Sequence, residues 1–188
     1  MNFDYNVRDT NSLRQIAKIT DEDFGLEQKE NGTSATTRLG ARGIVLDDEG
    51  HIAVIHKAAK NEYKLPGGGV DDGETPADAF VRECREELGC IVEITEELGT
   101  TEEYKSQENF KQLSFVFVAK KTDELMLNNL TDKEVAEGTT FLWLEKTKAL
   151  EIMKDSLNNL KSSDYDSVYR TKFMVLRDIR ILEDYLNR

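Results

Sequence analysis

The amino-acid sequence predicts an α/β fold, an α/β/α sandwich in which helices cover both faces of a mixed β-sheet. Three observations predict it. Segments rich in β-branched residues occur along the chain together with a few separate segments of helical periodicity. Hydrophobic residues make up 38% of the 188 residues, and only two residues are proline. A chain of this length buries roughly 70% of the surface that its unfolded form exposes, so we expect a core that needs no disulfides. Such a mixture of strands and helices is typical of a layered fold.

The first predicted strands form a hairpin. Residues 41–46 and 51–56 are apolar and rich in β-branched residues, and the segment 47–50 between them reads Asp-Asp-Glu-Gly, which is the composition of a turn. A short extended piece is predicted at 63–65. It ends at Pro66 and three glycines, because these residues interrupt regular structure.

A helix is predicted over residues 76–88, and the sequence marks both of its ends. Thr75 is a good N-cap, Pro76 suits the first helical position, and Asp78 lies three residues after the cap, as in a capping box. Gly89 is the expected C-terminal stop. These boundaries fix which side chains share a face of the helix.

The rest of the chain completes the predicted sheet and its cover. Further strands are predicted at 91–98, 112–119 and 139–144 from their β-branched and aromatic content. Helices are predicted at 146–153 and 168–186 from their periodicity. The last helix carries an apolar stripe that comprises Phe173, Leu176, Ile179 and Leu182. Two more helices are therefore available to cover the sheet.

The polar, weakly patterned residues 1–36 are predicted to be an N-terminal extension of a domain that comprises residues 37–188. This extension contains a loop-like stretch at 30–34. An edge hairpin, a dimerisation arm and a partly mobile leader all fit its composition, and the sequence does not decide between them. A homodimer that uses this segment is one expectation.

The net charge limits the classes of molecule that the protein is expected to bind. Lysine and arginine number 25 against 37 aspartate and glutamate residues, which gives a formal net charge of −12. This balance argues against broad nucleic-acid binding, which needs clustered cations. A small anionic ligand fits if a bound divalent cation reverses the local charge. No apolar run approaches the roughly 20 residues of a membrane-spanning helix, and a cytoplasmic location with reduced cysteines at positions 84 and 90 is expected.

Acidic side chains gather on one face of the helix over 76–88. The apolar face is predicted to comprise Ala77, Phe80, Val81, Cys84 and Leu88. Glu83, Glu86 and Glu87 occupy the adjacent arc, at the spacings at which helical side chains are neighbours. Such like charges repel each other, and Arg82, one turn before Glu86, relieves only part of the repulsion.

The carboxylates alone allow two interpretations: a solvated acidic face and a cation site. The surroundings favour the cation. A glycine-rich stretch, which allows close approach of a ligand to the backbone, precedes the helix, and Glu74, Asp71 and Asp72 lie between the two. Hard oxygen ligands without a cysteine or histidine cluster suit Mg²⁺ or Mn²⁺ rather than zinc.

The whole segment from Gly68 to Cys90 resembles the signature of the Nudix hydrolase family. Gly68 and Glu74 are followed by Arg82-Glu83-Cys84-Arg85-Glu86-Glu87-Leu88-Gly89-Cys90. Every charged and glycine position of the signature is matched, whereas cysteines stand at its two aliphatic positions, which keeps their apolar character. The preceding Leu65-Pro66-Gly67-Gly68-Gly69-Val70 is similar to the usual lead-in of the family.

The resemblance implies a hydrolase that uses Mg²⁺, or Mn²⁺ in its place, to cleave a diphosphate linkage in a nucleoside diphosphate joined to another group. By position, it implies that Glu83, Glu86, Glu87 and the Gly67 carbonyl bind the metal. Glu83 is also a candidate for taking the proton of the attacking water. Arg82 is expected to orient a carboxylate, and Glu74 to hold the loop to the helix.

Other residues have weaker assignments. Some family members use a later acidic residue as the general base, and Glu134 and Glu137 are the candidates here, although an exposed loop explains either equally well. Arg42 is a candidate phosphate ligand, with a surface ion pair as the alternative. His51 and His56 are interpreted as incidental.

Three functions remain open, and the substrate is undetermined. The first is metal-dependent hydrolysis of a nucleoside triphosphate, a nucleotide sugar or a dinucleoside polyphosphate. The second is a non-catalytic module that senses a nucleotide. Such a module would more often have lost one of the signature carboxylates, which are Glu83, Glu86 and Glu87 here. The third is another reaction on the same fold, such as isomerisation of an isoprenyl diphosphate, which would need a cysteine in the pocket, whereas Cys84 is predicted to face the core.

Overall fold

The computed structural model describes residues 13–30, 34–125 and 129–188, and in this part of the chain eight strands form one mixed sheet. The strands are β1 (Gln15–Ile19), β2 (Thr36–Leu46), β3 (Ile52–Lys57), β4 (Glu62–Lys64), β5 (Gly67–Gly69), β6 (Cys90–Lys105), β7 (Phe110–Glu124) and β8 (Thr139–Leu144). The helices are α1 (Pro76–Leu88), α2 (Asp132–Ala136), α3 (Lys146–Asn158) and α4 (Val168–Leu186).

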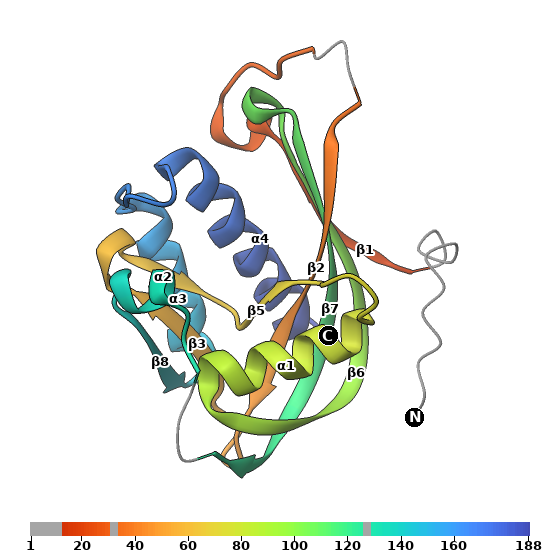
Figure 1. Cartoon of the computed structure of the whole chain (residues 1–188), viewed down its shortest axis with the longest axis vertical. Coiled ribbons are helices and arrows are strands. Elements are labelled where there is room, and N and C mark those ends of the chain that lie inside the picture. Colours follow the sequence, from red (N-terminus) through yellow and green to blue (C-terminus); the bar gives the residue numbers. More distant parts are fainter. Residues whose placement is uncertain (1–12, 31–33, 126–128) are drawn as a thin grey trace.

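The sheet combines parallel and antiparallel pairs in the order β1-β6-β7-β2-β3-β4, with β5 paired to β2 and β8 to β3. β6 and β7 form a long antiparallel hairpin, whereas β2 lies parallel to β7 and β1 parallel to β6. Figure 1 shows these long strands running the length of the molecule, with β5 crossing in front of β2. The prediction of a mixed sheet is therefore confirmed.

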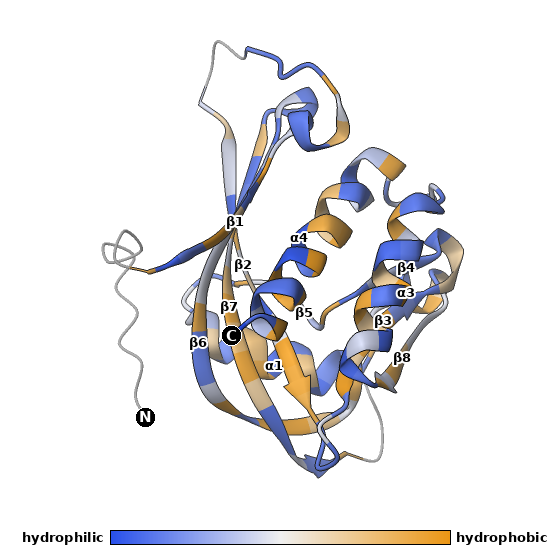
Figure 2. Ribbon diagram, turned by 180° about the vertical axis from the view of Figure 1, so that it is seen from behind, coloured by the Kyte–Doolittle hydropathy of each residue, from blue (hydrophilic) through white to orange (hydrophobic). Residues whose placement is uncertain are grey.

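Helices cover both faces of the sheet and enclose two apolar cores. α1 lies in front of the sheet in Figure 1, and the view from behind in Figure 2 shows α3 and α4 on the opposite side. Phe80 and Cys84 of α1 pack with Val45 and Phe117 in the first core. Ile44, Val54 and Val116 pack against Met153, Ile179 and Leu182 of α3 and α4 in the second. Both cysteines are free and buried.

The structure contains the predicted helices and strands, and several of its strands are longer than predicted. α1, β8 and α4 have the predicted bounds. β2, β6 and β7 extend beyond the predicted segments, since their added residues pair with neighbouring strands. The three glycines, predicted only to interrupt the chain, form strand β5 opposite Gly40, Ala41 and Arg42. The short helix α2 was not predicted, although Thr131 caps it with a capping box to Glu134.

The described part of the N-terminal extension is attached to the sheet and to α4. β1 lies at the sheet edge beside β6 and is not paired with β2, so these two consecutive strands do not form a hairpin. Arg14 donates to Asp184 of α4 at 2.9 Å, and the Tyr169 hydroxyl donates to Asp21 at 2.9 Å. Phe24 packs on Phe173 with 4.9 Å between ring centroids. Residues 1–12 lie outside the described part, and the dimerisation arm stays a prediction. Among the described residues, no helix is long and apolar enough to cross a membrane.

A cluster of buried charges lies between the sheet and α4. Glu103 is fully buried and accepts hydrogen bonds from Lys105 at 2.7 Å and from Arg177 at 2.5 Å. Arg177 also donates to Asp178 at 2.7 Å, and Asp178 accepts from the Leu65 backbone at 3.0 Å. α4 is therefore linked by hydrogen bonds to the chain just before the glycine strand.

The stability of the protein is expected to fall in acid because of Glu103. Burial opposes its charge, but the charges of Arg177, Lys105 and Arg42 together lower the pKa of Glu103 from 4.5 to about 2. A group with a depressed folded-state pKa stabilises the protein above its unfolded-state pKa, and that contribution is lost as the pH falls through the folded-state value. Urea unfolding at several values between pH 7 and pH 2.5 should therefore give a free energy of unfolding that declines below about pH 4.5. A constant value across this range would contradict the charged state of the cluster.

Candidate active site

The start of α1 is built by local capping at Thr75, but the predicted capping box is only half formed, because the Asp78 carboxylate accepts from the Thr75 hydroxyl at 2.6 Å rather than from the Thr75 backbone. The Thr75 hydroxyl accepts the backbone N–H of Asp78 at 3.1 Å, Pro76 occupies the first turn, and Gly89 ends the helix with a φ of 62°. Glu74 accepts two hydrogen bonds from Arg82, at 2.9 and 3.0 Å, and one from the Asp71 backbone at 3.2 Å. The predicted role of Glu74 in holding the loop to the helix agrees with these contacts.

Arg82 connects the loop, the glycine strand and two of the acidic residues. Its Nη1 donates to Glu83 at 2.9 Å and to Glu86 at 3.1 Å. Its Nη2 donates to the Gly69 carbonyl at 3.0 Å. The hydrogen bond to Glu74 and the charge of Glu83 both raise the pKa of Arg82 above its ordinary value. Arg82 therefore orients two carboxylates beside β5, which is the geometry that the sequence predicted for it.

Glu87 lines the same cleft as Glu83 and Glu86 but is more deeply buried than either. It is 2% exposed. Its carboxylate accepts from the Gly67 N–H at 2.8 Å and from Lys64 Nζ at 2.7 Å, and Lys64 also donates to the Gly67 carbonyl at 3.1 Å. Burial alone would lower the pKa of Lys64, but the charges of Glu87 and Glu62 raise it. Helical phase could not reveal this pair, because Lys64 comes from β4.

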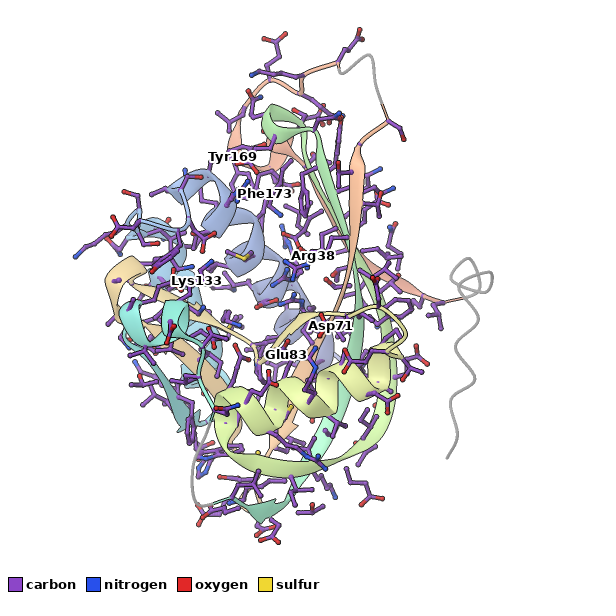
Figure 3. The ribbon with its side chains drawn as sticks, viewed as in Figure 1. Arg38, Asp71, Glu83, Lys133, Tyr169 and Phe173 are labelled. Atoms are coloured by element: carbon purple, nitrogen blue, oxygen red, sulfur yellow. The ribbon has the colours of Figure 1, made fainter. Side chains whose placement is uncertain are left out.

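Glu83 lies directly against Gly68. A Cβ atom built on Gly68 would stand 2.2 Å from Glu83 Oε1, so only glycine leaves room for this carboxylate. Figure 3 shows Glu83 pointing from α1 toward β5. Burial, together with the charge of Glu87, raises the pKa of Glu83, and Arg82 and Lys64 oppose this shift. An added cation beside Glu83 would therefore favour its charged form.

Replacement of Gly68 by alanine is expected to displace Glu83 while leaving the fold intact. Gly68 does not have a positive φ, so alanine is compatible with the backbone, and the three atoms nearest to the added methyl group all belong to the Glu83 carboxylate. Disturbing the orientation of a metal ligand typically costs 10–100-fold in metal affinity or activity. A Mg²⁺ titration of the hydrolysis rate should show the loss at an unchanged melting temperature. A variant as active as the parent would contradict the position of Glu83.

Arg82, Glu83, Glu86 and Glu87 line one wall of a charged cleft of about 380 Å³. Six further basic side chains line it: Arg38, Arg42, Lys57, Lys60, Lys64 and Lys133. Most of these are paired with acids, for example Lys60 with Glu62 at 2.7 Å. No aromatic residue is among the lining residues in the described part of the chain. Six acidic side chains also line the cleft, namely Glu62, Glu83, Glu86, Glu87, Glu134 and Asp166. Positive and negative side chains are therefore nearly balanced there, in a protein whose net charge is −12.

The remaining predicted residues divide into those that line the cleft and those that do not. Glu134 lines it, with its carboxylate accepting from the Thr131 backbone at 2.9 Å. Glu137 is 1% exposed and accepts from Lys57 at 3.0 Å, so the exposed-loop interpretation is wrong for this residue. His51 pairs with Asp47 at 3.1 Å and His56 stacks on Tyr63, and neither lines the cleft.

Arg42 also lines the cleft, but it is 4% exposed, which corrects the alternative of a surface ion pair. Its only ion pair within the described residues is with Asp178, at 3.8 Å. The nitrogen Nε of Arg42 is buried without a hydrogen-bond partner in this part of the chain. Burial and the nearby charge of Arg177 lower the pKa of Arg42 to about 10.

The oxygens predicted to hold a metal fit a hard divalent cation in their chemistry. They are the carboxylates of Glu83, Glu86 and Glu87 and the carbonyl of Gly67, and Mg²⁺ and Mn²⁺ prefer oxygen ligands. Among the described residues, no three acidic side chains form a ready-made metal cluster. Arg82 pairs with two of the carboxylates, and Lys64 with the third.

Comparisons with known proteins agree with this geometry. The model of the NUDIX domain matches residues 36–162, more than half of the chain. A MutT-like protein from Streptomyces ambofaciens is 27% identical over 131 residues, which are 69% of this chain and 79% of that protein. An RNA pyrophosphohydrolase from Halorhodospira halophila is 38% identical over 58 residues, 31% of this chain and only 32% of the relative.

Solved structures of low identity share the fold. A NUDIX hydrolase from Nitrosomonas europaea superposes with a TM-score of 0.59 at 13% identity, over 81% of this chain and 90% of that chain. The MutT protein from Methanosarcina mazei Go1 gives 0.53 at 16% identity, over 84% and 99%. The predicted α/β/α sandwich and the predicted resemblance of Gly68 to Cys90 are both confirmed. The chain belongs to the Nudix family.

Proposed function

We propose that this protein is a Mg²⁺-dependent hydrolase, with Mn²⁺ as a substitute, that cleaves a diphosphate linkage in a nucleoside diphosphate joined to another group. The observation that carries the proposal is the hydrogen bonding of Glu83 and Glu86 to Arg82 beside β5, on a cleft lined by both acidic and basic side chains. Nucleoside triphosphates, nucleotide sugars and dinucleoside polyphosphates are the substrates to test. Because two relatives that match short parts of the chain are RNA pyrophosphohydrolases, RNA with a 5′-triphosphate is tested as a fourth class.

The residues of the chain divide the work in this proposal. Glu83, Glu86 and Glu87, together with the Gly67 carbonyl, would hold the divalent ion, which supplies positive charge to the diphosphate and to its bound water when present. Arg82 orients the carboxylates through charge-assisted hydrogen bonds. Arg42 contacts a phosphate, and the carboxylate of Glu83 takes the proton of the attacking water.

Glu134 is the alternative base, because it lines the same cleft. One oxygen of its carboxylate accepts from the Thr131 backbone and hydroxyl at 2.9 and 2.8 Å, and one oxygen of Glu83 accepts from Arg82 at 2.9 Å. Glu137 is held by Lys57 and by the Ser163 hydroxyl, at 3.0 and 3.1 Å. Glu83 is the first candidate because it lies directly against the glycine strand.

The experiment is a screen of the full chain with Mg²⁺ and with Mn²⁺ against the four substrate classes, with identification of the products. Release of a nucleoside monophosphate, or of the corresponding RNA 5′-monophosphate, supports the proposal. Tight binding of one nucleotide without turnover in either metal would instead favour the non-catalytic sensing module. All three signature carboxylates are present, and this favours the enzyme. The cytoplasmic location and the homodimer stay predictions.

A further inference from the structure

Two arginines of β2 lie beside the proposed metal site and have no close acidic partner. Arg38 and Arg42 share one face of the strand, because they are four residues apart. Arg38 makes no ion pair or hydrogen bond with the described residues, and the only pair of Arg42 there is the 3.8 Å contact with Asp178. Both side chains line the cleft, and Figure 3 shows Arg38 between β2 and α4.

Polar groups fill the space between the two arginines. Gly40 occupies the intervening position on the same face, and a Cβ atom there would stand 2.7 Å from Gln112 Nε2 and 3.1 Å from both the Ser114 hydroxyl and the Gly68 carbonyl. The Gln112 amide therefore lies over the strand between the two arginine positions, with groups that can hydrogen-bond to an anion around it. A planar guanidinium matches the geometry of phosphate oxygens.

The burial of Arg42 needs a partner that the described residues do not supply. Its Nε is buried without a hydrogen bond, and a buried polar group without a partner is costly. The cluster behind it holds the buried bases Arg42, Lys105 and Arg177 against the buried acids Glu103 and Asp178. Glu87, which pairs with Lys64, is a third buried acid near Arg42. What Arg42 lacks is therefore a hydrogen-bond partner for its Nε, and an anion in the cleft would supply one.

We propose that Arg38 and Arg42 form a subsite for a phosphate group outside the cleaved diphosphate, so that preferred substrates carry a linear chain of at least three phosphates. Arg42 is the β-strand partner of Gly67, and paired strands have their Cα atoms about 5 Å apart. The subsite is thus adjacent to the proposed metal ligand, as the next phosphate of a chain requires. The inference rests on the proposed function and adds a substrate class to it.

Calorimetric titration of the full chain with inorganic tripolyphosphate and with pyrophosphate tests the subsite. Both titrations use Ca²⁺, which takes the same oxygen ligands with looser geometry. Arg38→Gln is expected to weaken tripolyphosphate binding roughly tenfold, the equivalent of one charge-assisted hydrogen bond, and pyrophosphate binding less than about twofold. Arg42→Lys keeps the buried charge but loses the planar guanidinium group. It should also weaken tripolyphosphate binding more than pyrophosphate binding.

Arg180→Gln is the matched control, since Arg180 is an exposed arginine of α4 that does not line the cleft. Equal losses for both ligands, no loss for either, or the same loss in the control would each overturn the subsite. If Arg42→Lys fails to fold, the exposed Arg38 decides the question. Metal-dependent hydrolysis without this selectivity would refute the subsite alone, whereas selectivity without hydrolysis of any substrate would refute the proposed function alone.

Discussion

Replacement of Glu86 by glutamine is expected to lower the metal-dependent rate of hydrolysis at least roughly 100-fold, the upper end of what perturbing a metal site typically costs. Glutamine keeps the shape of the side chain but removes the charge that is proposed to bind the cation. Glu86 is half-buried at the cleft, and its only described ion pair is with Arg82, at 3.1 Å. Arg82 keeps Glu74 and Glu83 as partners in the variant, so the melting temperature should stay close to that of the parent.

Glu93→Gln is the matched control for this experiment, since Glu93 is an exposed glutamate on β6. Initial rates are measured over a range of Mg²⁺ concentrations for both variants and for the parent. A Glu86→Gln protein that hydrolyses the substrate at the parental rate would refute the role of this residue. A loss that higher Mg²⁺ concentrations restore would place the effect in metal affinity rather than in the chemical step.

Elements that depend on neighbouring residues in the chain could be predicted from the sequence. α1 has its predicted ends because each end depends only on residues within one turn of it: Thr75 and Pro76 at the start, and Gly89 at the end. β5 could not be predicted, because three glycines have low strand propensity and pair with β2 only once the chain has folded. Gly67 adopts a φ of 134° there, and a Cβ atom on it would stand 2.3 Å from the Ala41 carbonyl. The glycines are therefore required by close packing as well as by the site.

The same distinction applies to the site. The pairing of Arg82 with Glu86 follows from spacing along one helix, and the sequence predicted it. The hydrogen bonds of Arg82 to Glu74 and to the Gly69 carbonyl join the helix to the loop and to β5, and helical spacing does not reveal them. The burial of Glu87 depends on Lys64, and the burial of Arg42 depends on α4, so both depend on tertiary packing. Arg177 and Asp178 lie within the apolar helix α4 and are fully buried there. Periodicity alone treats such charges as exposed, because it carries no information about partners on another strand.

Glu103→Gln is expected to reduce the free energy of unfolding by about 3–5 kcal/mol, the usual cost of removing one partner from a buried ion pair. Glutamine has nearly the same shape, so the change removes charge without creating a cavity. Lys105 and Arg177 would remain buried with one acid fewer between them. Because burial already lowers the pKa of Lys105, loss of its closest anion should lower that pKa further and favour the neutral amine.

Glu102→Gln is the matched control, because Glu102 is the neighbouring residue on β6 and makes two partly exposed ion pairs, with Lys18 at 3.3 Å and with Lys111 at 2.7 Å. Such pairs contribute up to about 1 kcal/mol. Urea unfolding should separate the two variants at pH 7. Toward pH 2.5 the parent loses the contribution of Glu103, so the difference between the parent and Glu103→Gln should shrink. A difference that persists unchanged in acid would show that packing, rather than the charge of Glu103, holds α4 against the sheet.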